Sequence, residues 1–116
     1  MELKEWWDVE YKIEKVEDQK FPLRLVLFIK NHSPYENLFE YYLKRINVKD
    51  SLNMLKFYLY TGLGAKNRIK VGKYSKERIE FKIPKLLVSN DTLSLEIGIR
   101  KVNEEGEKVV KVEIPV

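Results

Sequence analysis

The sequence contains no cysteine and a single histidine, His32, which excludes several classes of site. Without cysteine there is no disulfide, no thiolate metal ligand and no thiol nucleophile, so stability must come from packing, hydrogen bonds and charge pairs. Zinc sites that need paired histidines are excluded by the same count. His32 follows an apolar run in a polar stretch, a place typical of a turn or cap residue.

Alanine is also scarce. One alanine stands against eleven valines and nine isoleucines, so the best helix former is nearly missing and β-branched residues dominate. Lysine and glutamate interrupt every apolar run before it reaches the length of a membrane span. The first eight residues lack the basic start and apolar stretch of a secretory signal. If Met1 is the natural start, we expect a cytoplasmic protein.

What is present is a chain of 116 residues, of which 44% are apolar and 34% charged. This length suits one domain, so we expect a single β-sandwich domain over residues 1–116. Aliphatic and aromatic residues are too frequent for a disordered chain. Abundant lysine and glutamate, with one glutamine, are similar to the composition of proteins from hot habitats, although seven asparagines fit that comparison less well.

The N-terminal segment alternates apolar and charged residues with a period of two, which predicts a half-buried strand. Its inner face would carry Trp7, Val9, Tyr11 and Ile13. From Leu23 to Lys30 the alternation weakens, because Val26 and Phe28 add apolar residues to the second face. This pattern predicts a central strand that is covered on both faces.

The segment after this strand has the signals of a helix start. Ser33, Pro34 and Glu36 have the spacing of an N-cap, a first helical residue and a capping-box residue. We therefore expect one short helix near residues 34–40, followed by a strand at about 41–48 that is interrupted only by Lys44.

A further strand is expected between Leu55 and Tyr60, where apolar and other residues alternate ahead of Gly62. A helix is the alternative for this stretch, because the same residues do not exclude a helical period.

Alternation is clearest in the C-terminal half, where it predicts four strands. Their inner faces would carry Ile69 and Val71, then Ile79, Phe81 and Ile83, then Leu93, Leu95, Ile97 and Ile99, and finally Val110, Val112, Ile114 and Val116. Residues 103–107 would form the hairpin loop before the last strand. Short strands at intervals of roughly ten residues indicate an all-β, mainly antiparallel, two-sheet sandwich of about 7–9 strands.

One family resemblance supports this fold. The run from Leu25 to Pro34, Leu-Val-Leu-Phe-Ile-Lys-Asn-His-Ser-Pro, resembles the second strand of bacterial and archaeal immunoglobulin-like domains, in which an apolar strand ends in a Lys-Asn-x-Ser/Gly turn. The final hairpin is similar to their last two strands. The resemblance covers about half of the chain, without the paired cysteines and central tryptophan of antibody-like domains. It implies an immunoglobulin-like sandwich and leaves the function open.

Motifs for catalysis or cofactor binding are weak. The stretch 61–66 has two glycines but not the spacing of a phosphate-binding loop, and no serine has the context of a hydrolase nucleophile. Asp8, Glu10 and Glu14 fall on the solvated face of the first strand, and the acidic group at 103–107 matches no calcium loop. We therefore expect no enzyme activity, no metal and no cofactor.

Positive charge is concentrated between residues 66 and 85, where eight lysines and arginines stand against two glutamates. On the outer face of a predicted hairpin these cations could neutralise phosphates, with a tyrosine to stack on a base. The candidate nucleic-acid residues are Arg68, Lys70, Lys73, Tyr74, Arg78 and Lys82. The simpler interpretation is a solvated face balanced by its own glutamates or by an acidic neighbour.

Aromatic residues exceed what one core face holds. Trp6 and Trp7 point to opposite faces of a strand, so one of them leaves the core, and Tyr58 and Tyr60 face away from the predicted inner residues. Such side chains are enriched at protein interfaces. The main hypothesis is a non-catalytic interaction or structural module that binds protein, itself or another, through Trp6, Tyr58, Tyr60 and its strand edges. Nucleic-acid binding is the alternative, and cover by the segment after Ser33 would explain the aromatics without a partner.

Overall fold

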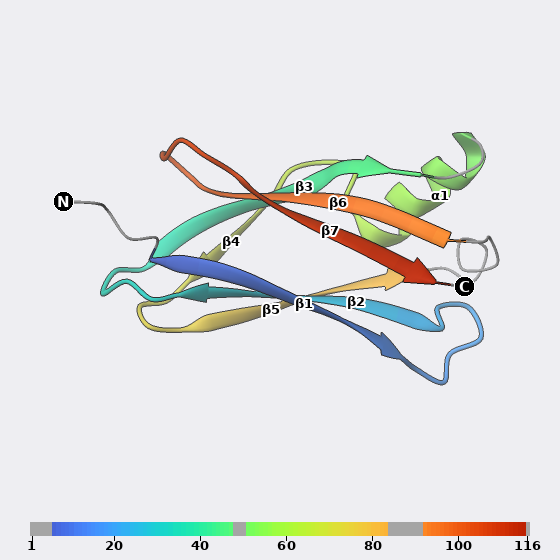
Figure 1. Ribbon diagram of the computed structural model, residues 1–116, viewed down its shortest axis with the longest axis horizontal. Helices are drawn as coiled ribbons and strands as arrows, with labels where there is room; N and C mark the ends of the chain where they lie inside the picture. The colour runs from blue at the N-terminus through green and yellow to red at the C-terminus, as the bar shows by residue number, and fades with distance from the viewer. Residues whose placement is uncertain (1–5, 48–50, 84–91, 116) are drawn as a thin grey trace.

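A computed structural model describes residues 6–47, 51–83 and 92–115. In these ranges the chain forms seven strands and one helix (Figure 1). In chain order they are β1 (Trp7–Lys15), β2 (Leu23–Asn31), β3 (Asn37–Ile46), α1 (Ser51–Thr61), β4 (Asn67–Val71), β5 (Lys76–Ile83), β6 (Thr92–Lys101) and β7 (Lys108–Pro115). None of the helical structure in the described ranges is long and apolar enough to cross a membrane.

The strands form two sheets that pack face to face. One sheet has three strands in the order β1-β2-β5, and the other has four in the order β4-β3-β6-β7 (Figure 1). Neighbouring strands pair antiparallel throughout. The predicted all-β, mainly antiparallel, two-sheet sandwich is therefore confirmed.

The core lies between the sheets and takes the inner face of each strand. Two aromatic contacts connect the sheets: the ring centroids of Trp7 and Phe39 are 5.1 Å apart, and those of Tyr41 and Phe81 are 6.0 Å apart. The side chains with less than 2% exposure include Leu25, Leu27, Ile29, Phe39, Ile83, Ile97, Ile99 and Ile114. Burying each aliphatic side chain of this size contributes about 1.5–3 kcal/mol to folding, so this layer holds the sheets together.

β2 is the central strand of its sheet, as the sequence predicts. Val26 is buried although it belongs to the outer face. Long charged side chains supply cover on this face, because the Nζ atoms of Lys12 and Lys76 lie 5.7 and 5.3 Å from the centroid of the Phe28 ring. The aliphatic parts of these lysine side chains thus cover the outer face of β2, as the second sheet covers its inner face.

The short helix predicted near residues 34–40 is wrong, because β3 begins at Asn37. The side chains that suggested a helix start form a turn instead. The Ser33 hydroxyl donates to the Tyr35 carbonyl over 2.9 Å, and Nδ2 of the buried Asn31 donates to the same carbonyl over 2.8 Å. Serine and asparagine side chains that satisfy nearby backbone groups in this way compete with the helix.

The strand predicted at about 41–48 is present as part of β3, which starts earlier, and Val48 lies outside the described residues. The register of β3 with β6 shifts between Leu43 and Arg45. Lys44 is the additional residue of this β-bulge, so Tyr42 and Arg45 both lie on the outer face of the sheet. The interruption that the sequence shows at Lys44 therefore has a structural cause.

The strand predicted from Leu55 to Tyr60 is also wrong, and the alternative of a helix is confirmed, since these residues belong to α1. The glycine that follows ends the helix. Gly62 has a φ of +73°, and its N–H donates to the Tyr58 carbonyl over 2.9 Å. This is the left-handed C-terminal cap for which glycine is preferred.

The strands predicted in the C-terminal half are present as β4, β5, β6 and β7, and residues 103–107 lie in the loop that joins β6 to β7. Val116 and the side chain of Leu93 lie outside the described residues.

Candidate interaction surfaces

α1 carries apolar side chains on two opposite sides. Phe57 is 1% exposed and belongs to the core, and the helix packs against β5. On the other side, Leu52, Leu55 and Leu59 are 58%, 53% and 72% exposed. Their spacing of three and four residues places them in one stripe along the helix. We refer to Leu52, Leu55 and Leu59 as the leucine face.

The C-terminal end of α1 is fixed to the sandwich. The Thr61 hydroxyl donates to the Phe57 carbonyl over 2.8 Å and accepts from the Leu63 amide over 3.2 Å. Leu63 is buried, and its carbonyl accepts a hydrogen bond from the Leu43 amide of β3. Because Phe57 and Leu63 anchor the helix from one side, the leucine face is left on the outside.

The alternating sequence pattern did not predict the leucine face. Leu55, Phe57 and Leu59 occupy alternate positions and so predict one face of a strand. In a helix, Leu55 and Leu59 share one side and Phe57 lies opposite them. The spacing of three and then four residues from Leu52 is the signal that would have found the face.

The aromatic candidates do not form one surface. Trp6 is 48% exposed and immediately precedes β1, whereas Tyr58 is 36% exposed on α1, at the opposite end of the molecule (Figure 1). The expectation that one of the two tryptophans leaves the core is confirmed, because Trp7 packs against the core cluster. The side chain of Tyr60 lies outside the described residues.

The predicted basic hairpin is wrong, because β4 and β5 belong to different sheets. The chain crosses between the sheets through residues 72–75, where Tyr74 is 70% exposed and has a φ of 51°. The nucleic-acid candidates are therefore divided among three places: Arg68 and Lys70 on the outer face of β4, Lys73 and Tyr74 in the connection, and Arg78 and Lys82 on the outer face of β5. The single phosphate-binding surface that the sequence suggested does not form.

Both arginines among these candidates make ion pairs within the chain. Nε of Arg68 lies 3.2 Å from Oε2 of Glu40, and Nη2 of Arg78 lies 2.7 Å from Oε1 of Glu14. The hydrogen bond that Lys12 makes with Glu14, together with those from Arg78, lowers the pKa of the Glu14 carboxyl against the effect of burial. These cations stabilise the outer faces of the two sheets.

Glu40 is a buried carboxylate on the outer face of the four-stranded sheet, with 3% exposure. Its oxygens lie 3.1 Å from Nε of Arg100, 3.2 Å from Nε of Arg68 and 3.8 Å from Nζ of Lys66. Burial acts to raise the pKa of Glu40, but the hydrogen bonds and charges of these three cations bring that pKa below its ordinary value. A carboxyl group held ionised in this way is suited to structural pairing and poorly suited to general acid catalysis.

A second charged group lies beside it, around Tyr42. The Tyr42 hydroxyl donates to Glu107, and Nζ of Lys44 donates to the other oxygen of Glu107 over 2.8 Å. The hydrogen bond from Lys44, followed by that from Tyr42, lowers the pKa of Glu107, while the bond to Glu107 raises the pKa of Tyr42. A Cβ at Gly98 would lie 2.8 Å from Cζ of Tyr42, so the sheet needs glycine at this point. Glu107, which the sequence places among the acidic loop residues, is thus used in packing.

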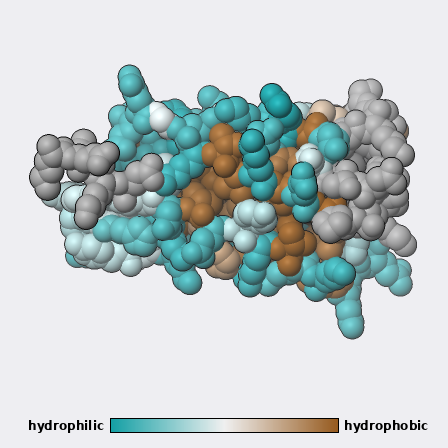
Figure 2. Space-filling model, viewed as in Figure 1, coloured by the Kyte–Doolittle hydropathy of each residue, from teal (hydrophilic) through white to brown (hydrophobic). Residues whose placement is uncertain are grey.

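Apolar side chains also reach the surface along the side of the sandwich where β1 and β7 lie (Figure 2). Tyr11 on β1 is 46% exposed and Val109 on β7 is 38% exposed. The inner residues Val9, Ile13 and Val110 are only half-buried. We refer to this region as the β1/β7 side.

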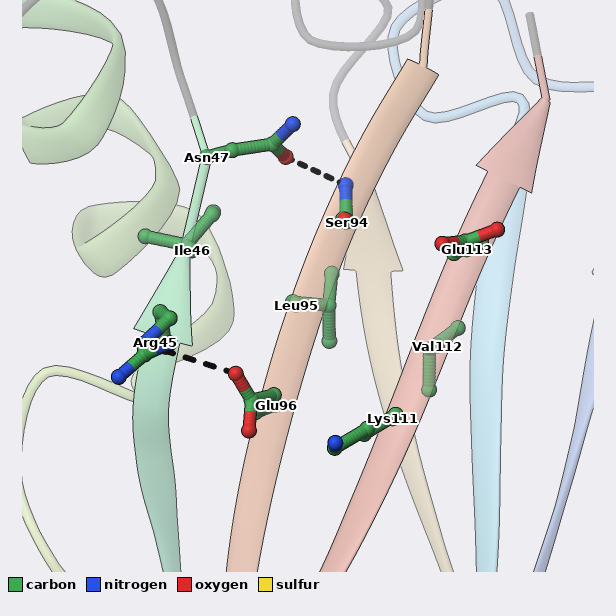
Figure 3. A pocket seen from close by; sticks show the side chains of 9 residues that line it. All are labelled: Arg45, Ile46, Asn47, Ser94, Leu95, Glu96, Lys111, Val112 and Glu113. Carbon is green, nitrogen blue, oxygen red and sulfur yellow. Dashed lines mark hydrogen bonds and ion pairs between the residues drawn. The ribbon is translucent and has the colours of Figure 1, made fainter.

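A shallow depression of about 200 Å³ lies across the ends of β3, β6 and β7 (Figure 3). Its lining residues are Arg45, Ile46, Asn47, Ser94, Leu95, Glu96, Lys111, Val112 and Glu113. Nε of Arg45 lies 3.6 Å from Oε2 of Glu96, and Asn47 accepts a hydrogen bond from the Ser94 amide. The depression is smaller than the usual ligand pocket of about 300–1,000 Å³.

Within the part of the chain that the structure describes, no three acidic or histidine side chains are grouped to hold a metal ion. Nε2 of His32 lies 3.3 Å from Oδ2 of Asp8, and the His32 amide donates to the Trp6 carbonyl over 2.7 Å. His32 therefore ties the end of β2 to the start of β1, which fits the turn role expected from the sequence.

No protein-family model and no curated protein matches this chain. A similar solved structure is the crystal structure of the yeast GGA1 GAE domain, which is 14% identical in sequence. The match covers 99% of this chain and 96% of that chain, with a TM-score of 0.41. That score is too low to support conclusions about function, so the fold assignment rests on the strand pairing described above.

Proposed function

We propose that this chain is a non-catalytic protein-binding module with an immunoglobulin-like strand order, and that the leucine face of α1 is its contact surface for a partner protein. Aromatic side chains are not the support for this proposal. The support comes from aliphatic side chains on a helix that is anchored from its other side.

The exposure of the leucine face carries the proposal. Leu59 is 72% exposed, and its two neighbours in the stripe are more than half exposed. Burying a leucine side chain contributes about 1.5–3 kcal/mol of favourable free energy. Three neighbouring exposed leucines can therefore contribute several times this amount when a partner covers them. Contiguous apolar side chains on a solvent-exposed surface mark contact sites. A helix that presents residues at this spacing is suited to docking in the apolar groove of another protein.

The strand order supports the immunoglobulin-like part of the proposal. In constant-type immunoglobulin domains, the first, second and fifth strands share one sheet, and the third, sixth and seventh strands share the other. β1, β2 and β5 are likewise together here, as are β3, β6 and β7. The difference is β4, which pairs with β3 instead of lying beside β5. Because such sandwiches carry unrelated functions, the fold alone does not identify the partner.

Photo-crosslinking tests the proposed contact. A photoreactive residue in place of Leu55, in an extract of the source cells, should form an adduct with a discrete protein. The adduct should be lost when Leu52→Glu and Leu59→Glu are added, because charge prevents burial of the stripe. A photoreactive residue in place of Lys70 on β4 is the matched control at an exposed site away from α1.

Two results would contradict the proposal. One is an adduct pattern at Leu55 that equals the pattern at Lys70. The other is an adduct at Leu55 that persists with both glutamate substitutions, or that forms with lipid and with no protein.

A further inference from the structure

β7 is an edge strand with an open side. Among the residues that the structure describes, its sole strand neighbour is β6. It spans Lys108–Pro115 with the sequence Lys-Val-Val-Lys-Val-Glu-Ile-Pro, which is rich in β-branched residues. An edge of this length and composition is a template for pairing with another strand unless charges oppose it.

The outward charges of an edge strand decide whether it can pair with its own copy. In a symmetric antiparallel pair, residues at equal distances before and after the central residue face each other, and like charges in opposition are unfavourable. For the other three edges, the register that matches inner faces over most of the strand opposes like charges. The like pairs are Asp8 with Glu14 on β1, Arg68 with Lys70 on β4, and Lys76 with Lys82 on β5. In the same registers Glu10 would face Lys12 on β1 and Arg78 would face Glu80 on β5, so these two edges combine attractive with repulsive pairs.

β7 differs from these edges because its register gives complementary charges and no pair of like charges. Centred on Val112, the pairing places Lys111 of each copy opposite Glu113 of the other, twice by symmetry. A shift of two residues would oppose Lys111 to itself or Glu113 to itself, and a shift of one would oppose inner to outer residues. The charges and the pleat therefore select one register.

The side chains that would make these contacts are available. In the described part of the chain, neither Lys111 nor Glu113 has an ion pair, and both line the depression at the end of the sheet (Figure 3). Within one copy, Arg45 lies opposite Glu96, and Glu96 lies opposite Lys111. Glu113 of a second copy would continue this row as the next charge of alternating sign.

The pairing would also bury apolar side chains on the inner face of the sheet. Val110, which is only half-buried, would lie opposite Ile114 of the second copy. The second β7 would extend the sheet at the β1/β7 side, where Tyr11 is 46% exposed. Apolar surface on this side would leave the water as the sheet is continued.

We propose that two copies of this chain pair antiparallel through β7, centred on Val112, and so form a symmetric dimer with one continuous eight-stranded sheet. This inference uses a different surface from the leucine face of α1 and does not depend on it.

Charge reversal tests the dimer in the full chain. Sedimentation velocity over a concentration series should show self-association of the parent. Lys111→Glu or Glu113→Lys alone should weaken it by roughly tenfold or more, because two attractive pairs become two repulsive pairs. The double variant Lys111→Glu with Glu113→Lys should restore it. Lys70→Glu on β4 is the matched control and should leave association unchanged.

Disulfide trapping tests the register. Because the chain has no native cysteine, a disulfide can form only between the introduced residues. A chain with Lys111→Cys, mixed with a chain with Glu113→Cys, should give a linked heterodimer, whereas either chain alone should stay unlinked. A parent that remains monomeric at all concentrations overturns the proposal. So does a double charge variant that fails to restore association, or a mixture that fails to link while the parent dimerises.

Discussion

At the scale of single residues, the outer face of the four-stranded sheet is organised around Glu40. This carboxylate is buried and is surrounded by Lys66, Arg68 and Arg100. A buried charge is tolerated when its partners and hydrogen bonds compensate for the lost water, and three cations around one carboxylate provide this compensation. Removing the carboxylate would leave three neighbouring positive charges without their common partner.

The pH dependence of stability should report on Glu40. Its pKa in the folded chain lies below the 4.5 of an unperturbed glutamate. A carboxyl group with a lowered pKa contributes stability that is fully present above pH 4.5 and is lost as the pH falls through the folded-state pKa. Glu40→Gln should therefore unfold at lower urea concentration than the parent at pH 7, and the difference should shrink as the pH approaches 3.

Glu104→Gln is the control for this measurement. Glu104 lies at the exposed tip between β6 and β7 and pairs with Lys101 over 2.9 Å. Because exposed pairs contribute little, this variant should stay close to the parent throughout. A loss of stability in Glu40→Gln that is the same at pH 7 and pH 3 would contradict the assigned role.

At the scale of elements, α1 combines an anchored side with an exposed side. Phe57 and Leu63 hold it on the core, and Gly62 ends it. The sequence between Ser33 and Thr61 predicted the wrong order of helix and strand, because tertiary contacts override the local signals of this segment. Ser33 caps a turn through its hydroxyl, and Gly62 caps a helix where a strand exit was expected.

Stability measurements should separate the two sides of α1. Phe57→Ala should cost about 3–5 kcal/mol in the free energy of unfolding, because it opens a cavity in the core. Leu59→Ala should change it by no more than about 0.5 kcal/mol, since the side chain is mostly in water. Urea unfolding followed by circular dichroism compares them. Equal costs for the two variants would contradict the orientation of the helix.

At the scale of the whole molecule, the two sheets share one core. The buried cluster contains residues of both sheets together with Phe57 and Leu63. The Trp7–Phe39 contact joins β1 to β3 across the layers, with 5.1 Å between the ring centroids. Neither sheet has a separate core of its own within the described residues, so the sandwich should unfold as one cooperative unit.

Two probes should therefore agree during unfolding. Tryptophan fluorescence reports on Trp6 and Trp7 at the start of β1, whereas far-ultraviolet circular dichroism reports on both sheets. We expect coincident urea transitions with one midpoint. A fluorescence transition at clearly lower urea concentration would show that β1 separates before the rest, which is contrary to a shared core. The variant Trp6→Phe isolates the signal of Trp7.

The sequence by itself determined most of the strands, since alternation of apolar residues is a local consequence of one buried face. β1, β2, β4, β5, β6 and β7 follow from such patterns, and so does the two-sheet class. Alternation shows that a face is buried, but it does not show which element buries it. Only the tertiary structure therefore placed Arg68 and Arg78 in different sheets and brought Lys66 and Arg100 to Glu40. It also turned Leu52, Leu55 and Leu59 outward, because the opposite side of α1 fills the core.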